Sequence, residues 1–205
     1  VCGLAAISPE EIDHVMHGTT VATNTVLTGT GARVGLVTTR CYRQVLQIAR
    51  SFVPGGLGGW VIYNKSLPMA PLALTIEADE RVSSKGEVVD ALDETKLRAD
   101  LRALGEKRIE ALTVSLINSF ANDRHERRIK EIAQEVLPGI PVSLSSEVVP
   151  EMQEYERTVT TVANSYVRPR VQKYVHNLQA KLDAKAKRVK LHILRSDGGL
   201  ASAKA

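Results

Sequence analysis

The segment that decides the fold reads IEALTVSL at residues 109–116, DRHERRIKEIAQEVLPG at 123–139 and PVSL at 141–144. The two apolar runs are typical of buried strands. Between them, Asp123 and Glu126 have the spacing of a capping box, and a Pro-Gly pair closes the helix that this box opens. A strand, a helix and a second strand in succession predict a βαβ crossover in a parallel sheet.

The same alternation continues on both sides of this segment. The β-branched run RVGLVT at residues 33–38 suits a buried strand, and two short runs joined at Gly86 suit a hairpin. Residues 51–72 hold several glycines and prolines and predict one long loop. The prediction adds strands at 74–82, 87–89 and 189–194, and helices at 8–16, 42–49, 93–104 and 151–184. The first of these helices opens with a capping box at Ser8 and should turn Met16 inward, and the third is capped by Asp93 and ended by Gly105.

The helix predicted at 151–184 is the longest element. Val159 and Val162 belong to an apolar stripe at three-to-four spacing, so this side of the helix should face the sheet. Pro169 removes a backbone donor, and we expect a kink or two abutting helices near Arg168. The expected class is α/β, with a mixed, mainly parallel sheet and a long C-terminal helix.

Composition excludes several classes of protein. The 205 residues are 43% hydrophobic, enough for a core, and the formal net charge is only +4 with both signs interspersed, which is weak evidence for nucleic acid. No apolar run approaches the roughly 20 residues of a membrane span. The first residues lack the pattern of a signal peptide, so a cytoplasmic protein is expected. Cys2 and Cys41 lack metal-ligand spacing, so both are expected to be ordinary thiols.

The densest group of polar side chains is HGTTVATNT at residues 17–25. Hydroxyls, an amide and an imidazole surround a glycine where the chain leaves one element and opens a helix. Such a turn can present N–H groups and hydroxyls to a phosphate or a carbonyl. A threonine cap beside a structural His17 explains the spacing equally well.

Two further polar segments are candidates for a site. EYERT at residues 154–158 opens the long helix, where a solvated helix start explains most of the charge. SDGG at residues 196–199 follows the last predicted strand and could bind a ligand oxygen or a metal. A Ser-Asp-Gly-Gly tetrapeptide is, however, first of all a turn.

These segments, taken in order, resemble the N-terminal region of the hydantoinase A/oxoprolinase family. The similarity spans essentially the whole chain and rests on HGTTVATNTVL, GARVGLVTTR, EADERV, LSSEVVPEMQEYERTVTTVANSYVRP and ILRSDGGL. The family includes ATP-dependent hydantoinases, 5-oxoprolinases and subunits of acetone and acetophenone carboxylases. The glycine-rich SFVPGGLGGW at residues 51–60 is more similar to the hydantoinase and ketone-carboxylase branch than to the oxoprolinases.

The resemblance implies an actin-like, ribonuclease H-like ATPase in which nucleotide lies between two lobes. Residues 1–185 would form the N-terminal lobe, incomplete at its start, and residues 186–205 would begin the second, truncated lobe. The family's two phosphate loops are expected before Val1 and beyond Ala205. ATP and Mg²⁺ are therefore implied as cofactors of the complete enzyme, and the fragment alone is expected to be inactive and to bind neither tightly.

The resemblance also implies a set of site residues. His17 and Thr20 would be catalytic, as part of the family's HGTT-x-ATN motif. Asp197 replaces the usual Asn of the family's S-N-G-G motif, which leaves an amide-specific role at this position without support. No metal ligand is assigned. The residues implied to bind substrate or nucleotide are Gly18, Thr19, Asn24, Glu154, Arg157, Ser196, Asp197, Gly198 and Gly199.

Two functions follow as expectations. The first is a subunit of an ATP-dependent hydrolase that opens a cyclic amide, or of a related enzyme that activates a ketone for carboxylation, working with a second, hydantoinase B-type subunit in a hetero-oligomer. The alternative is a noncatalytic lobe that docks a partner subunit through the long helix and the Trp60 loop. Neither nucleic acid nor a membrane is expected as a partner.

Overall fold

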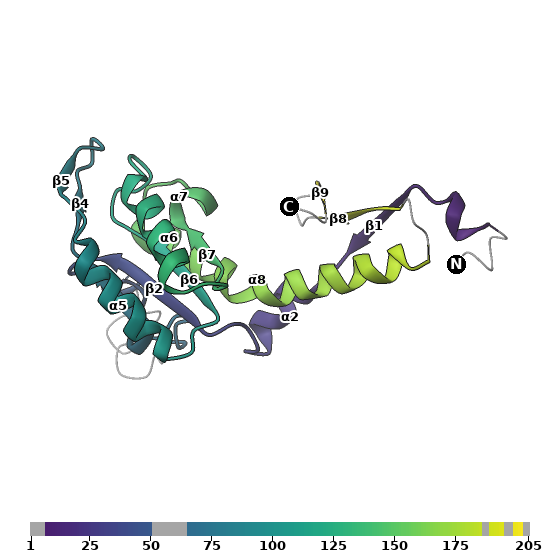
Figure 1. Ribbon diagram of the computed structural model, residues 1–205, viewed down its shortest axis with the longest axis horizontal. Helices are drawn as coiled ribbons and strands as arrows, with labels where there is room; N and C mark the ends of the chain where they lie inside the picture. The colour runs from purple at the N-terminus through teal and green to yellow at the C-terminus, as the bar shows by residue number, and fades with distance from the viewer. Residues whose placement is uncertain (1–6, 51–64, 186–188, 195–198, 203–205) are drawn as a thin grey trace, which may run out of the picture. The chain divides into compact units, whose positions relative to one another are not determined.

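The computed structural model describes residues 7–50, 65–185, 189–194 and 199–202 (Figure 1). The chain divides into two compact units. The larger unit is Ala32–Tyr166, and the smaller unit combines Val1–Gly31 with Val167–Ala205. Most of the loop predicted at residues 51–72 lies outside the described residues.

The larger unit is built on a four-stranded sheet in the order β3-β2-β6-β7, in which all neighbouring strands are parallel. All residues of β2, β6 and β7 are buried, as expected of parallel strands that are covered on both faces. The predicted parallel sheet and the βαβ crossover are therefore confirmed. The strands are β2 (Val34–Thr39), β3 (Thr75–Ala78), β6 (Ala111–Ser115) and β7 (Val142–Leu144).

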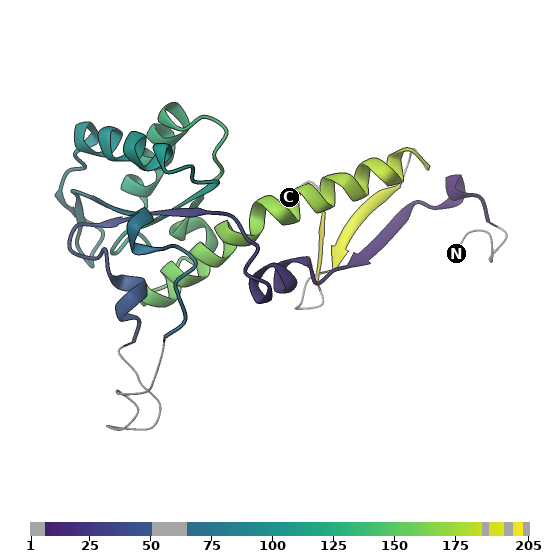
Figure 2. The ribbon, with the colours of Figure 1, turned by 90° about the horizontal axis from the view of Figure 1, so that it is seen from below.

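Helices cover both faces of this sheet (Figure 2). Leu36 and Val37 are adjacent in β2 and lie in different hydrophobic cores, because side chains alternate between the two faces of a strand. One core is filled from α5 and α6, and the other from the first half of α8. The helices are α3 (Val45–Ile48), η2 (Leu72–Leu74), α5 (Glu94–Glu106), α6 (Arg124–Val136), α7 (Ser145–Val148) and α8 (Glu154–Asp183).

The stripe of α8 that faces the sheet is partly polar. Val162 is 1% exposed in the apolar core, as predicted. On the same helix, the hydroxyls of Thr158 and Ser165 are hydrogen-bonded to the sheet hydroxyls of Ser115 (2.8 Å) and Thr113 (2.6 Å). Paired hydroxyls can be buried at little cost, so the threonines and serines of this stripe are packing residues.

The hairpin predicted at Gly86 is confirmed, but the single strand predicted at residues 74–82 is divided between β3 in the four-stranded sheet and β4 (Arg81–Val82) in a two-stranded sheet. The hairpin of β4 and β5 (Val88–Asp90) turns at Gly86, whose φ of 83° favours glycine. Gly105 was predicted to end the helix that Asp93 caps, but it lies inside the last turn of α5. A Cβ at Gly105 would lie 2.5 Å from Leu137, so this glycine is required by packing and not by termination.

The smaller unit contains a three-stranded sheet in the order β1-β8-β9. The strands β1 (His14–Gly18) and β8 (Lys190–Leu194) are parallel, whereas β9 (Leu200–Ser202) is antiparallel to β8. The strand predicted at residues 189–194 is thus confirmed. Helix α2 (Val21–Leu27) follows β1. The later part of α8, from Val167, belongs to this unit.

The helix predicted at residues 8–16 is wrong. Pro9–Glu11 form a single 3-10 turn, η1, and His14–Gly18 form a strand. The backbone N–H of Glu10 reaches the Ser8 hydroxyl at 3.3 Å, so the capping signal is present but is followed by only one turn. The residues that follow pair with β8 and form a strand. Met16, which was expected to face inward, is 69% exposed.

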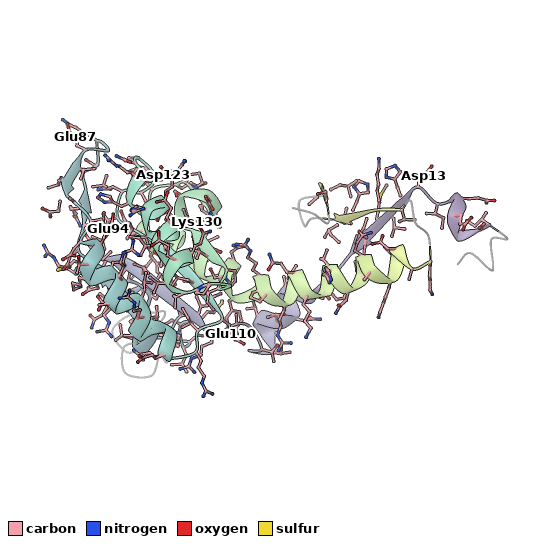
Figure 3. The ribbon with its side chains drawn as sticks, in the orientation of Figure 1. Asp13, Glu87, Glu94, Glu110, Asp123 and Lys130 are labelled. Atoms are coloured by element: carbon pink, nitrogen blue, oxygen red, sulfur yellow. The ribbon has the colours of Figure 1, made fainter. Side chains whose placement is uncertain are left out.

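Helix α8 is one helix from Glu154 to Asp183 with Pro169 inside it, not two abutting helices. The capping box predicted for α6 is also wrong. Asp123, labelled in Figure 3, makes no side-chain cap bond among the described residues and instead accepts from Arg127 Nε at 2.7 Å. In the described ranges, no helix is long and apolar enough to cross a membrane.

Candidate functional site

The HGTT segment lies where β1 ends and α2 begins. His17 and Gly18 are the last two residues of β1, and Thr19 and Thr20 connect the strand to the helix. The expected change of element at this point is confirmed. A strand-to-helix turn places polar side chains at the edge of a sheet, where ligands of open α/β sheets bind.

The side chains of the turn are linked by weak hydrogen bonds. Thr20 occupies the N-cap position of α2, but within the described residues its hydroxyl accepts no backbone bond there. Its Oγ1 accepts instead from Asn24 Nδ2 at 3.3 Å. Thr19 Oγ1 accepts from the Val21 N–H, also at 3.3 Å. The Thr20 hydroxyl therefore does not form the simple threonine cap that the sequence also allowed.

His17 is oriented by a residue of the long helix. Its Nε2 lies 2.7 Å from the Tyr174 hydroxyl, and the two ring centroids are 5.8 Å apart. The imidazole is half-buried. One ring nitrogen of His17 is thereby engaged by a neutral hydroxyl, which fixes the plane of the ring without adding a charge.

Strands β1 and β8 end next to each other in the sheet. Gly18 is paired with Leu194, so both strands end at the same level. Thr19 follows Gly18, and the SDGG connection follows Leu194 before β9 begins at Leu200. Ser196, Asp197 and Gly198 lie outside the described residues.

The other two predicted site residues, Glu154 and Arg157, belong to the larger unit. Arg157 is 1% exposed, and its Nη2 donates to the Leu116 carbonyl at 2.5 Å. Burial lowers the pKa of this guanidinium, while the carboxylates of Glu126 and Glu154 act in the opposite direction. Its Nε is buried and has no hydrogen-bond partner among the described residues.

The sequence did not single out a buried polar network at the carboxyl ends of the parallel strands. Glu126 is fully buried, and its Oε1 accepts from the Leu116 N–H (3.0 Å) and the Ser145 hydroxyl (2.6 Å). Its Oε2 accepts from the N–H (2.9 Å) and the hydroxyl (2.7 Å) of Ser146. Glu126 therefore joins α6 to the end of β6 and to the start of α7.

A second buried carboxylate lies in the same region. Glu80 accepts from the Thr39 hydroxyl at 2.5 Å and pairs with His125 Nδ1 at 2.6 Å. Helical spacing could have located both networks, because Glu126 and His125 lie three or four residues before the buried Ile129 of α6. Their buried partners, however, come from loops distant in sequence.

We expect Glu126→Gln to destabilise the chain by about 2–3 kcal/mol, because the amide nitrogen replaces an oxygen that accepts two buried donors. Urea unfolding followed by circular dichroism measures the change. Glu131→Gln is the matched control on α6. Its exposed carboxylate pairs with Arg128, and loss of this surface ion pair should cost less than about 1 kcal/mol. Equal, small losses in the two variants would contradict the assigned role of Glu126.

Comparison with protein families decides the class of this chain. The profile of the hydantoinase/oxoprolinase N-terminal region matches residues 2–137, and a second hydantoinase/oxoprolinase profile matches residues 157–205. The chain belongs to the hydantoinase/oxoprolinase family. The resemblance of its motifs to this family is thereby confirmed.

Several members of the hydantoinase/oxoprolinase family are similar in sequence. The acetophenone carboxylase gamma subunit of Aromatoleum aromaticum is 33% identical over 93% of this chain and 28% of its own length. The caprolactamase subunit alpha of Pseudomonas jessenii is 31% identical over 97% of the chain and 30% of its own length. The chain thus spans less than a third of these relatives, both of which are named as subunits.

Two solved structures share the fold. The ATP-dependent caprolactamase from Pseudomonas jessenii has a TM-score of 0.88 at 29% identity, over 98% of this chain and 30% of that one. Nucleotide-free acetone carboxylase has a TM-score of 0.88 at 22% identity, over 100% of this chain and 31% of that one. The parallel sheet and the long C-terminal helix are therefore those of hydantoinase-type enzymes.

Proposed function

We propose that the chain is part of an ATP-dependent enzyme subunit that opens a cyclic amide or activates a ketone for carboxylation. The observation that supports this most directly is the parallel register of Gly18 with Leu194. Thr19 and Thr20 of the HGTT motif follow Gly18 directly in the sequence, and SDGG follows Leu194 after Arg195. The related caprolactamase is described as ATP-dependent, and a related subunit belongs to acetophenone carboxylase.

In this proposal the three-stranded sheet of the smaller unit belongs to an actin-like, ribonuclease H-like ATPase. Residues 1–185 contribute to its first lobe, and residues 186–205 begin the second. The small share of each relative that the chain covers, 28% and 30%, supports a longer subunit with further nucleotide-binding elements. A second subunit of the hydantoinase B type would complete the enzyme.

The polar groups of the HGTT turn can form hydrogen bonds with the oxygen atoms of a phosphate or a carbonyl. Thr19, Thr20 and Asn24 provide hydroxyls and an amide, and Gly18 leaves room for a ligand close to the backbone. Among HGTTVATNT and SDGG, Asp197 is the single carboxylate, so Mg²⁺ would depend on it or on residues elsewhere. Bound ATP with Mg²⁺ would supply the phosphoryl group that activates the substrate oxygen.

His17 has the position of an orienting or proton-donating group. Tyr174 holds its Nε2, which leaves Nδ1 as the nitrogen that could donate to or accept from a substrate oxygen. Thr20 would hold phosphate or substrate next to it. Glu154 and Arg157 would act in the complete enzyme from the larger unit. Arg157 contributes there only if a ligand or partner segment reaches its buried guanidinium.

The test is an ATP hydrolysis assay on the complete subunit with its partner subunit. Hydantoin, 5-oxoproline, caprolactam, acetone and acetophenone are supplied in turn, the ketones together with bicarbonate. We expect one of these substrates to raise ATP turnover by ten-fold or more over the substrate-free rate, on the order of the gain from positioned catalysis. A non-hydrolysable ATP analogue serves as the control.

An ATP turnover that no cyclic amide or ketone changes would contradict the proposal. It would favour a noncatalytic lobe that docks a partner subunit through α8. The Trp60 loop, which that alternative also uses, lies outside the described residues. Pull-down of the partner subunit by the chain alone would then be the deciding measurement.

A further inference from the structure

The outer face of the β1-β8-β9 sheet carries two histidines and a methionine. Alternation along β1 puts His14 and Met16 on one face, and the register pairs Met16 with His192 of β8. His14 is exposed, and Met16 is 69% exposed. Asp13, labelled in Figure 3, directly precedes this strand. The side chains of β1 and β8 that alternate with these, such as Leu191, point to the buried face.

The two imidazoles are already in contact. His14 Nδ1 lies 2.9 Å from His192 Nε2, and the ring centroids are 5.1 Å apart with an interplanar angle of 28°. A hydrogen bond between two neutral imidazoles accounts for this distance. The same distance also suits two ligands of one metal ion. Two nitrogen atoms that each lie 2.0–2.1 Å from the ion, at right angles to each other, are roughly 3 Å apart.

We infer that His14 and His192 form a binding site for a transition-metal ion, with Met16 as a third donor, and that copper is the preferred ion. Imidazole binds Zn²⁺, Cu²⁺ and Ni²⁺, and among divalent ions Cu²⁺ is bound most tightly by a given set of ligands. A thioether adds affinity for Cu⁺. In the part of the chain that the structure describes, no larger cluster of His, Cys, Asp or Glu competes for the ion.

Binding requires small movements. The ring that donates this hydrogen bond must change tautomer by exchange with water, so that its proton sits on the other ring nitrogen, because a metal ligand is a neutral imidazole with a free lone pair. One or both rings must then turn so that the lone pairs converge on one point. Both residues are on the surface, and exposed side chains change rotamer easily.

Lys190 acts against the site. It is the cross-strand neighbour of His14 on the same face, and its ammonium repels a cation. Its long stem allows the charge to stay in solvent away from the ion. Two imidazoles and a weakly bound sulfur leave further coordination positions for water, so the site is expected to exchange its ion. This inference stands independently of the proposed ATP-dependent activity.

The test is Cu²⁺ titration of the chain in a Cys2→Ser, Cys41→Ser background, which removes competing thiols. We expect one ion per chain and an electron paramagnetic resonance spectrum with two nitrogen ligands. His14→Gln and His192→Gln should each lower the affinity by about ten-fold or more, since loss of a ligand costs at least as much as loss of an outer-shell partner. His176→Gln, at an exposed position of α8, is the matched control and should change nothing.

Met16→Leu separates the two oxidation states. It should weaken Cu⁺ binding and leave Cu²⁺ binding nearly unchanged, because the thioether is a soft ligand. Circular dichroism checks that each variant is folded. The inference is overturned if the His14→Gln, His192→Gln double variant still binds Cu²⁺ as the parent does, or if His176→Gln loses as much affinity as His14→Gln. A spectrum with no nitrogen ligands would also overturn it.

Discussion

Val162→Asp should unfold the larger unit. Val162 is 1% exposed in the core that α8 forms with β2 and β6, where the neighbours Val34, Leu36 and Ala111 are apolar. An unpaired carboxylate there costs on the order of 3–5 kcal/mol. A natural domain has only about 5–15 kcal/mol of stability, so the variant should lose its cooperative melting transition or melt far below the parent.

Val89→Asp is the matched control for this prediction. The same substitution is made in the same unit, but Val89 of β5 is 62% exposed. It should cost less than about 1 kcal/mol, which is the range of strand preferences at the surface. Thermal melting followed by circular dichroism compares the two variants. A melting temperature for Val162→Asp within a few degrees of that for Val89→Asp would show that this face of α8 has been misassigned.

The α/β architecture could be predicted because its signals are local. The apolar runs of β2 and β6 are short and bounded by breakers, and the two helices that pack beside them have clear apolar stripes. Asp93 caps α5 as its spacing indicates, accepting from the Lys96 N–H at 3.0 Å. Each of these elements is specified by residues within one or two turns of it, so sequence spacing is sufficient.

The elements that were predicted wrongly depend on partners that are distant in sequence. His14–Gly18 form a strand because β8, more than 170 residues later, pairs with them, as the register of His14 with Lys190 shows. Glu126 does not form the expected capping box, because its carboxylate accepts hydrogen bonds from buried donors at the end of β6 and the start of α7. In both cases tertiary contacts overrode a local signal that was present.

The candidate site was predictable as a motif but not as an arrangement. The polar composition of HGTT and the helix that opens after it follow from the sequence, and the structure has this helix as α2. The strand before the motif was predicted as a helix. That Tyr174 would hold His17 could not be predicted, because the two residues are 157 positions apart. Arg157 shows the reverse problem, since its charge indicates a surface role and its position in α8 buries it.

His17→Ala and Thr20→Ala, made in the complete subunit with its partner, should each lower substrate-dependent ATP turnover by about ten-fold or more, the usual cost of losing one positioned acid-base or hydrogen-bonding group. Their effects on stability should be small. His17 loses one hydrogen bond, to Tyr174, worth about 1 kcal/mol. Thr20→Ala removes one long hydrogen bond at the surface, from Asn24 Nδ2 to the Thr20 hydroxyl at 3.3 Å. The melting temperature of this variant should therefore hardly change.

Tyr174→Phe separates a catalytic His17 from a structural one. It removes the same hydrogen bond as His17→Ala but keeps the imidazole, so both variants should lose similar stability. If His17 acts on the substrate, Tyr174→Phe only loosens the ring and should retain much more ATP turnover than His17→Ala. If His17 is structural, the two variants should melt early together and the folded enzyme should turn over at the parent rate in both, which would remove His17 from the site.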